Sequence, residues 1–391
     1  MFSNSILGEI LKLLPRDVVA RHVREHGSDR WCKRFRSWDH LVALATAQLS
    51  GASSLRELEV VFNGQSRHQY HLNAHPVRRS TLSDASRSRT PLVFRDIAMA
   101  MIARGGRRQR LAKEILTILD SSTITISGRG SDWASGSRSR AHNQGLKLHV
   151  QYDHGSGDLG YVEVTDANVN DITQALDIPL VANHIYIFDK GYCDYNWWQA
   201  IAEQGSFFVT RLKRNAAFAI IEERGICPED DGFILEDQLI RLTNKNPGGG
   251  RRNHLAGIPL RLIRIKHPAG KTRPFWIVSN ALEATAAQIA GWYKARWSIE
   301  LLFKWLKQNL LLKTFMGESR NAVMIQLFVA MITYILAKLY HELTQGSLGK
   351  RLKDTLMAVR VNLFARPETV RRRRATEAIT KQNQPELWGM T

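Results

Sequence analysis

The segment GWYKARWSIELLFKWLK, residues 291–307, predicts a helix with two adjoining faces. At about 100° per residue, one acid, two bases and a phenol fall within an arc of about 60° on the helical wheel: Tyr293, Arg296, Glu300 and Lys307. The adjoining sector is apolar and holds Ile299, Leu302, Phe303, Leu306 and Leu310. We therefore expect the apolar sector to pack on a sheet and the polar stripe to lie at its rim. A solvated helix face with ordinary ion pairs has the same pattern, and geometry alone does not choose between the two.

Two apolar runs upstream of this helix each lead into an aspartate. Residues 115–119 precede Asp120, and residues 185–188 precede Asp189. Because chemistry in an open α/β sheet gathers where strands end, we expect the two carboxylates to share one site. Carboxylate oxygens are the ligands that hard cations such as Mg²⁺ prefer. The sequence therefore predicts an α/β core with a shared metal site beside the polar stripe of the helix.

Further strand signals surround the two aspartates. Residues 145–153 alternate between apolar and polar side chains, and residues 159–165 follow as a second strand, so the two predict a hairpin. Later strand-like runs lie at 233–240, 260–266 and 275–278. The chain then has a helical pattern from about residue 284 to residue 343.

Both ends of the chain differ in character from this middle part. The first 110 residues predict helices at 4–14, 38–49, 54–62, 81–89 and 94–104. The polar helix at 81–89, with Ser80 as its cap and with Arg87 and Arg89, suits helix-turn-helix reading of DNA. A solvated surface helix fits the same residues equally well. The tail, residues 346–391, contains Arg371–Arg374 and is expected to be poorly packed.

Composition points to a polyanionic partner. The chain has 391 residues, which suggests two or three domains, and its 44% of hydrophobic residues excludes wholesale disorder. Its net charge of +19 predicts binding to DNA, RNA or an anionic membrane. Residues 1–110 carry a net +10 and residues 351–391 a net +5, whereas the 240 residues between them carry only +4. We expect the ends, above all the N-terminal region, to supply the salt-dependent affinity, so that a chain starting near Leu111 would keep the metal site and lose this affinity.

The membrane alternative is weak. The most apolar stretch, residues 322–337, is short for a membrane span and includes Gln326 and Thr333, so we expect a buried core helix. The first 14 residues lack a secretory pattern. The three cysteines are too far apart for a disulfide framework or a zinc ribbon, which favours a reducing cytoplasm: Cys32, Cys193 and Cys227.

The spacing Tyr293-x2-Arg296-x3-Glu300-x6-Lys307 resembles the Y-R-E-K box of DDE transposases of the insertion-sequence-four family. Asp120-Ser-Ser-Thr and Asp189-Lys-Gly-Tyr resemble the two aspartate segments of that family. The first 75 residues are similar to the small helical domain that often precedes its core. The resemblance covers most of the chain and is weakest in the last 45 residues.

The resemblance implies the fold class and the domain order. The expected fold is α/β, with a ribonuclease-H-like catalytic core that holds a β-rich insertion and follows an all-α N-terminal DNA-binding region. The expected segments are a helical DNA-end-binding domain (1–75), a helical connector (76–110), the first part of the core (111–210), the insertion (211–282), the second part of the core with the glutamate helix (283–345) and the basic tail (346–391).

The resemblance also implies the chemistry. Asp120, Asp189 and Glu300 would hold two Mg²⁺ ions, with Mn²⁺ as a substitute. Two ions about 3.5–4 Å apart stabilise the attacking and leaving oxygens of an in-line phosphoryl displacement. The enzyme would bind the terminal inverted repeats as a homodimer in the bacterial cytoplasm, at the nucleoid. It would excise the element through hairpin ends and integrate it by strand transfer.

Four further residues are expected to contact DNA. Arg296 and Lys307 are candidates for gripping phosphates at the cleaved end, and Tyr293 for a hydrogen bond to the same phosphate. Stacking on an aromatic ring would offset the base stacking that a distorted terminus loses. Trp276 is the candidate for this stacking, and Trp297 is its competitor.

Two other functions stay open at this point. One is an inactive or regulatory DNA-binding relative, although all three acids are present. The other is a Mg²⁺-dependent nuclease of the same fold that cuts DNA without joining it. Strand transfer of pre-cleaved ends, compared between the wild type and Glu300→Gln, separates these functions from an active transposase.

Overall fold

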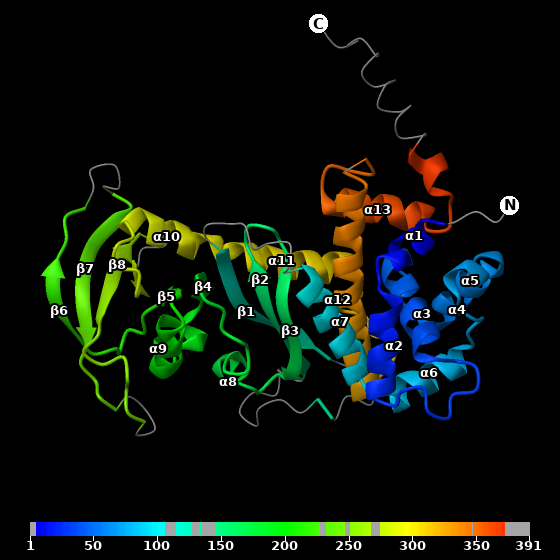
Figure 1. Cartoon of the computed structure of the whole chain (residues 1–391), viewed down its shortest axis with the longest axis horizontal. Helices are drawn as coiled ribbons and strands as arrows, with labels where there is room; N and C mark the ends of the chain where they lie inside the picture. Colours follow the sequence, from blue (N-terminus) through cyan, green and yellow to red (C-terminus); the bar gives the residue numbers. More distant parts are fainter. Residues whose placement is uncertain are drawn as a thin grey trace, which may run out of the picture.

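The structure is a computed structural model that describes residues 5–105, 115–126, 133–134, 145–226, 232–246, 251–266, 274–345 and 347–371. Residues 372–374 of the predicted basic tail, together with Cys227, lie outside these ranges. Helices gather at the N-terminal end, and a long twisted sheet with one helical rod along it forms the rest (Figure 1). This is the predicted fold class, an all-α region followed by an α/β core of ribonuclease-H-like type with a strand-rich insertion.

Seven helices form the described part of the N-terminal region: α1 (Ile6–Lys12), α2 (Arg16–Glu25), α3 (Ser37–Ser50), α4 (Leu55–Asn63), α5 (Ser66–Leu72), α6 (Arg79–Ser88) and α7 (Leu92–Gly105). The hydroxyls of Ser5 and Ser54 cap α1 and α4, and Gly51 ends α3 with φ of 81°. Helices α2 and α5 were not predicted. Helix α6 begins earlier than expected, with Arg78 rather than Ser80 at its cap.

One sheet of nine strands runs through the remainder of the described chain, in the order β3-β2-β1-β4-β5-β9-β8-β7-β6. The strands are β1 (Ile115–Thr125), β2 (Gly145–Asp153), β3 (Leu159–Asp166), β4 (His184–Phe188), β5 (Phe207–Arg211), β6 (Phe218–Glu223), β7 (Ile234–Leu242), β8 (Pro259–Ile265) and β9 (Phe275–Ser279). Strands β1, β4 and β5 are parallel neighbours, whereas β2 and β3 are antiparallel. Between the strands lie α8 (Asp171–Ala175), the 3-10 turn η2 (Lys190–Tyr192) and α9 (Tyr195–Glu203).

The insertion continues the core sheet. Strand β9 pairs antiparallel with β5, and β8, β7 and β6 follow outward. The three strand runs predicted here are confirmed. Strand β6 was missed because its side chains alternate poorly, and most of them are exposed at the sheet edge.

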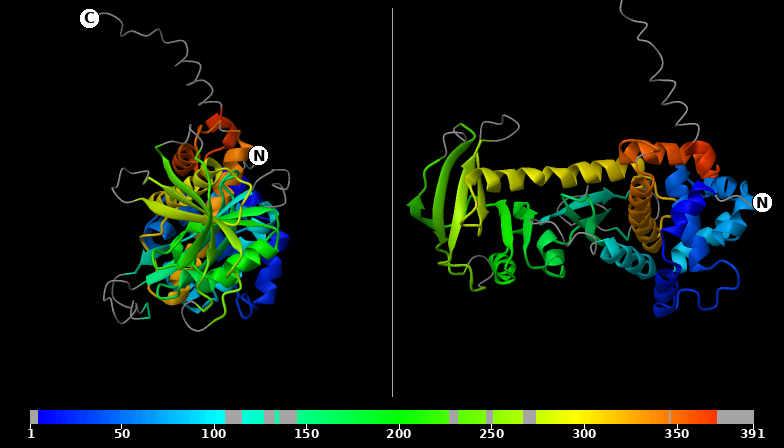
Figure 2. Two further views of the ribbon diagram at one scale, coloured as in Figure 1. Left: turned by 90° about the vertical axis from the view of Figure 1, so that its left-hand side faces the viewer. Right: turned by 45° about the horizontal axis from the view of Figure 1, so that its top comes forward.

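The helix of the opening segment crosses this sheet as a rod. It consists of α10 (Ala286–Ala295) and α11 (Trp297–Asn309), joined at Arg296, whose φ of −51° and ψ of −32° remain helical. Figure 2 shows the rod, in yellow, running from β6–β9 to the orange α12. The predicted apolar sector is buried in full, from Ile299 to Leu310. The rod therefore presents its polar stripe to the carboxyl ends of β1 and β4.

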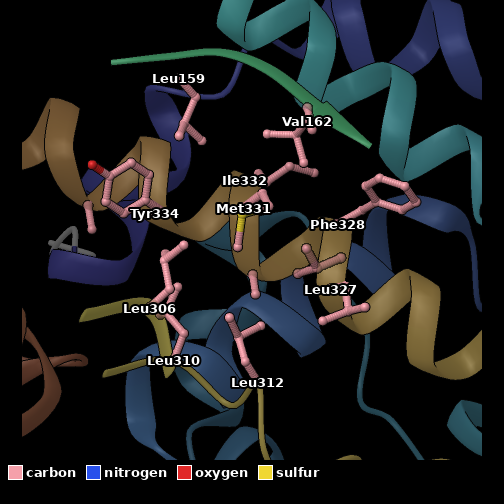
Figure 3. Packing of buried hydrophobic residues seen from close by; sticks show 14 of the residues in the cluster. Leu159, Val162, Leu306, Leu310, Leu312, Leu327, Phe328, Met331, Ile332 and Tyr334 are labelled. Atoms are coloured by element: carbon pink, nitrogen blue, oxygen red, sulfur yellow. The ribbon is translucent and has the colours of Figure 1, made fainter. Parts of the chain in front are cut away.

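The core helix predicted near residue 330 is α12 (Arg320–Leu343). Among the described residues it is the one helix that is long and apolar enough to cross a membrane, and 78% of its most apolar 18 residues are buried inside the protein. Figure 3 shows Ile332 beside Val162 of β3, and Met331 in the same cluster as Leu306 of the rod. The side chain of Gln326 is satisfied by backbone groups of residues 311–316. The prediction of a buried core helix is confirmed.

The expectation of a poorly packed tail is wrong for its first half. Helix α13 (Leu352–Asn362) packs on α3 and α12, with Leu356 and Val359 buried. The backbone N–H groups of Ile6 and Leu7 donate to carbonyls of Ala365 and Leu363, so the segment after α13 is tied to α1. The many basic residues of the tail obscured an apolar face that α1, α3 and α12 cover.

The N-terminal helices and the catalytic core share one hydrophobic cluster, with members in α1, α3, α7, β2 and α12. Helix α12 contacts α3, α6 and α7 along its length. A chain that starts near Leu111 would uncover this helix. We therefore expect such a chain to lose the folded site rather than to retain it, and charge substitutions in the full chain are the sharper test of the DNA affinity of the N-terminal region.

Candidate active site

The two aspartates lie at one point of the sheet. The parallel pairing of β1 with β4 ends at Leu119 and Phe188, so Asp120 and Asp189 are the next residue on each strand. Strand β1 continues to Thr125 beside β2, which corrects the expectation that it ends at Asp120. Because β4 ends at Phe188 while β1 continues to Thr125, β1 has no described strand beside it on this side from Asp120 onward. This leaves room there for a side chain from a third element.

Helix α11 supplies that group. Arg296 donates through Nη1 to Asp120 Oδ2 at 3.2 Å and through Nη2 to Glu300 Oε1 at 2.6 Å. One guanidinium thus joins two of the three predicted acids. The structure brings together the strand and the helix that the sequence separates by 176 positions.

The third acid is tied to the same rod by Tyr293. Its hydroxyl donates to Asp189 Oδ1 at 3.5 Å, and its ring lies 5.8 Å from that of Phe275. Burial raises the pKa of Tyr293 to about 12, so the phenol keeps its proton and acts as a donor.

Lys307 closes the far side of the site. Its Nζ donates to Ser122 Oγ at 2.7 Å and to the Thr123 carbonyl at 3.1 Å. Burial, together with the charge of Lys313, lowers the pKa of Lys307. All four residues of the predicted stripe therefore face β1 and β4.

The three carboxylates lie close together in a partly buried site. Burial raises the pKa of Asp120 to about 6, and the carboxylates of Glu300 and Asp189 act in the same direction, against the Ser121 N–H and Arg296. The acids face a cavity of about 580 Å³ whose lining adds Lys304, Lys307, Gln308 and Lys313. A cavity lined by both carboxylates and cations suits a DNA phosphate that binds beside a divalent ion.

The family described as "Transposase DDE domain" matches residues 111–336, more than half of the chain. The chain belongs to this transposase family. A family described as "Domain of unknown function" matches residues 3–74 of the same transposase.

Named relatives agree with this assignment. The transposase is 38% identical, over 66% of its own length and 70% of the relative, to a Sinorhizobium fredii protein named as transposase y4zB. It is 26% identical to a Geobacillus stearothermophilus protein named as a transposase for insertion sequence element IS5377, over 68% of each chain. It is also 26% identical to a Synechocystis protein named for element IS4SA, over 68% of this chain and 73% of the relative. The transposase is therefore of insertion-sequence type, which is consistent with the predicted subfamily.

A solved structure supports the fold. A piggyBac transposase synaptic complex with hairpin DNA matches with a TM-score of 0.51 at 10% identity, over all of this chain and 87% of the other. At this identity the likeness concerns the fold alone.

The transposase carries the donor chemistry of a Mg²⁺ site. Three carboxylates face one cavity, and burial, together with the charges of Glu300 and Asp189, raises the pKa of Asp120. Among the described residues, no three His, Cys, Asp or Glu side chains stand ready around one cation position. Arg296 lies between Asp120 and Glu300, where its guanidinium neutralises part of the negative charge that a divalent ion would otherwise neutralise. The residues thus fit a divalent ion, which transposases of this family use.

The structure does not place Trp276 beside the polar stripe of α10 and α11. Its neighbour on β9, Phe275, packs toward Tyr293, and alternation turns Trp276 to the opposite face of the sheet. There its ring lies 6.4 Å from that of Phe218, with the guanidinium of Arg264 5.5 Å from its centroid. Trp297 is 59% exposed at the start of α11.

Arg89 does not read DNA as a helix-turn-helix residue would. It is buried, and it donates to His40 Nδ1 and to the Phe35 carbonyl and lies 3.7 Å from Asp29. Helix α6 packs on α4 and α12. The helix-turn-helix hypothesis is therefore wrong for Arg89, which holds the loop before α3.

Sequence analysis missed one acid beside the site. Asp171, at the start of α8, accepts from Ser121 Oγ at 2.7 Å and pairs with Lys147 at 3.0 Å. Lys147 also donates to the Val169 carbonyl, so it ties β2 to the start of α8, and Asp171 links this point to Ser121 of β1, next to Asp120. No spacing in the sequence predicted Asp171, because an acid in the first turn of a helix is common and does not by itself indicate a site.

Proposed function

We propose that the transposase binds the terminal inverted repeats of its insertion sequence and catalyses their excision and integration at Asp120, Asp189 and Glu300. The observation that carries this proposal is the meeting of β1, β4 and α11 through Arg296 and Tyr293. Two side chains of the helical stripe, Tyr293 and Arg296, contact the two strand acids, and Arg296 also holds Glu300 beside them, which a merely solvated helix face would not require.

The three carboxylates are the residues that would hold the divalent ions. When bound, these ions supply the charge that stabilises the attacking and leaving oxygens of in-line phosphoryl displacement. Arg296 and Lys307 bind the phosphates of the cleaved end, and Asp120 and Glu300 would hold a divalent ion in place of the Arg296 guanidinium beside these carboxylates. The Tyr293 hydroxyl orients one phosphate oxygen. The half-buried cavity keeps bulk water away from the reacting 3′-hydroxyl.

Excision through hairpin ends belongs to the same proposal. An aromatic ring would replace the stacking that the terminal base loses in a hairpin. Trp276 is the ring proposed from the sequence, but it lies on the sheet face opposite Tyr293, and Trp297, exposed next to Arg296, is its competitor. The hairpin yields of Trp276→Ala and Trp297→Ala, measured side by side on a blunt transposon end, assign the role to the variant that loses hairpins yet still joins pre-cleaved ends.

Strand transfer tests the proposal. The DNA that flanks the reading frame supplies the terminal repeats, and a pre-cleaved, labelled end from it is incubated with a supercoiled target plasmid and Mg²⁺. We expect joined product with the wild type and loss with Asp120→Asn, Asp189→Asn or Glu300→Gln. The loss should exceed the roughly 10–100-fold that removal of an outer-shell partner costs a metal site.

Glu283→Gln is the matched control, because Glu283 is exposed and lies before α10, away from the stripe. Equal joining by Glu300→Gln and the wild type would show that Glu300 is not a catalytic acid. Cut but unjoined DNA would favour the plain nuclease, and binding without either product would favour the inactive or regulatory relative. Crosslinking of the end complex tests the proposed homodimer.

A further inference from the structure

A second charged groove lies in the N-terminal region, apart from the carboxylates. It has a volume of about 1560 Å³ and runs between the loop of residues 26–36, which joins α2 to α3, and helix α6. Figure 1 shows this loop beside α6, below α3. The groove is built from the part of the chain with the largest excess of positive charge.

Exposed cations line this groove. Lys33, Arg34 and Arg78 are exposed, and no ion pair or hydrogen bond of their side chains is found within the described ranges. Opposite them the lining has two acids, Glu59 and Asp84. Three unpaired cations along one groove produce a field that favours a polyanion.

An exposed aromatic ring stands at the same loop. Trp31 is 87% exposed and has φ of 68°, a left-handed conformation that is rare for a bulky residue. The guanidinium of Arg30 lies 5.4 Å from its ring centroid. Strained backbone that holds a large apolar ring in water points to a function for the ring.

Buried contacts fix this loop in place. Asp29 accepts from the Ser37 N–H at 2.6 Å and from the Ser37 hydroxyl at 2.7 Å. Arg89 donates to the Phe35 carbonyl at 2.7 Å from below. The ring of Trp31 is thus presented by an anchored loop, which lowers the entropy lost on binding.

We propose that this groove binds duplex DNA of the transposon end, with Lys33, Arg34 and Arg78 on the phosphates and Trp31 against the sugars and base edges. The inference rests on the proposed function for the identity of the polyanion. Charge complementarity carries it, because three cations without partners among the described residues and one exposed ring line the same groove. The buried Arg89 then acts as a positioning residue for the loop.

Binding without chemistry tests the inference. The full chain with Glu300→Gln, in EDTA, is titrated against a labelled 40-bp duplex from the flanking DNA, by fluorescence anisotropy at several salt concentrations. Replacing Lys33, Arg34 and Arg78 with Gln should weaken binding at least about tenfold and make the log–log salt slope shallower by about 3, or about 1 per lost phosphate contact. A matched triple, Arg21, Arg24 and Arg56 to Gln, removes equal charge from exposed positions outside the groove and should change the slope less.

The ring has a separate signature. Trp31→Ala should weaken binding about tenfold with the salt slope unchanged, since the indole carries no charge. Trp31→Phe should recover part of that loss. Tyr70→Ala is the control, because Tyr70 is 85% exposed but lies outside the groove. Thermal midpoints of all variants confirm that they are folded.

The outcomes are distinct. Wild-type affinity and slope in the groove triple, or equal effects of the two triples, would overturn the inference while leaving the carboxylate site intact. Absence of duplex binding by the parent protein would instead count against the proposed function. A preference for RNA over duplex DNA of the same sequence would also overturn the inference.

Discussion

Arg296 donates a hydrogen bond to Asp120 Oδ2 at 3.2 Å, so a helix residue neutralises a strand acid that lies 176 positions earlier. The same guanidinium reaches Glu300 at 2.6 Å. The site is thus held together by a cation of the protein itself. A phosphate must compete with the carboxylates for this guanidinium, and a divalent ion must compete with the guanidinium for the carboxylates. Experiments can therefore compare the site with Arg296 paired to Asp120 and Glu300 and the site with a divalent ion beside these carboxylates.

Arg296→Gln should destabilise the metal-free protein. Without the guanidinium, Asp120 and Glu300 repel each other in a half-buried site, at a cost of about 1–3 kcal/mol in the free energy of unfolding. Mg²⁺ should then raise the thermal midpoint of the variant more than that of the wild type. Arg320→Gln, which breaks an exposed pair with Asp166, is the control. Equal midpoints of Arg296→Gln and the wild type in EDTA would contradict this account.

His149 should make the fold sensitive to acid. Burial lowers its pKa from 6.5 to about 4, so between these pH values the unfolded chain binds a proton that the folded chain does not. The free energy of unfolding should therefore fall as the pH drops from about 6.5 to 4, by up to about 3 kcal/mol from this group. His149→Gln should flatten that part of the pH profile in urea titrations, whereas the exposed His254→Gln should leave it unchanged. A variant profile as steep as that of the wild type would show that His149 is not the cause.

Lys307→Gln should weaken the grip on the cleaved end. The ammonium group lies on the wall of the cavity and is held toward β1 by Ser122. Loss of one phosphate contact should make the salt slope of end binding shallower by about 1, with an affinity loss of about tenfold. Lys294→Gln removes an exposed charge from α10 and serves as the comparison. The measurement is anisotropy with a pre-cleaved duplex; an unaltered slope in Lys307→Gln would leave Lys307 a purely structural residue.

Helix α13 should contribute to global stability. Leu356 is buried against the shared core, so Leu356→Ala should lower the free energy of unfolding by about 2–5 kcal/mol. Val361 lies on the same helix but is 83% exposed, so Val361→Ala should stay within about 0.5 kcal/mol of the wild type. Urea unfolding of the two variants gives the comparison. Similar stabilities would mean that the C-terminal segment is detached in solution.

Local sequence pattern was sufficient for the elements that carry the site. The alternation of residues 145–153 and the apolar runs before Asp120 and Asp189 predicted strands, because side-chain period follows directly from backbone geometry. The 3.6-residue period of segment 291–307 predicted both the buried sector and the polar stripe. The apolar density of residues 322–337 likewise predicted the core helix.

Pattern failed where burial depends on distant partners. Residues 352–362 have the composition of a basic tail, but in the structure they form a helix whose apolar face packs on α1, α3 and α12. Arg89 looked like a surface cation, yet Asp29 and His40 enclose it. The position of Trp276 relative to the stripe depended on which face of β9 meets α10.

The sequence by itself determined the kind of chemistry: three acids, two bases and a phenol, in an order and spacing that belong to a transposase. Only the tertiary structure decided how they meet, since β1 and α11 are joined by contacts across 176 positions that no local period encodes. It also decided that the N-terminal helices and the catalytic sheet share one core around α12. The physical reason is that periodicity reports which face of an element is apolar, whereas the partner that covers this face is chosen by packing.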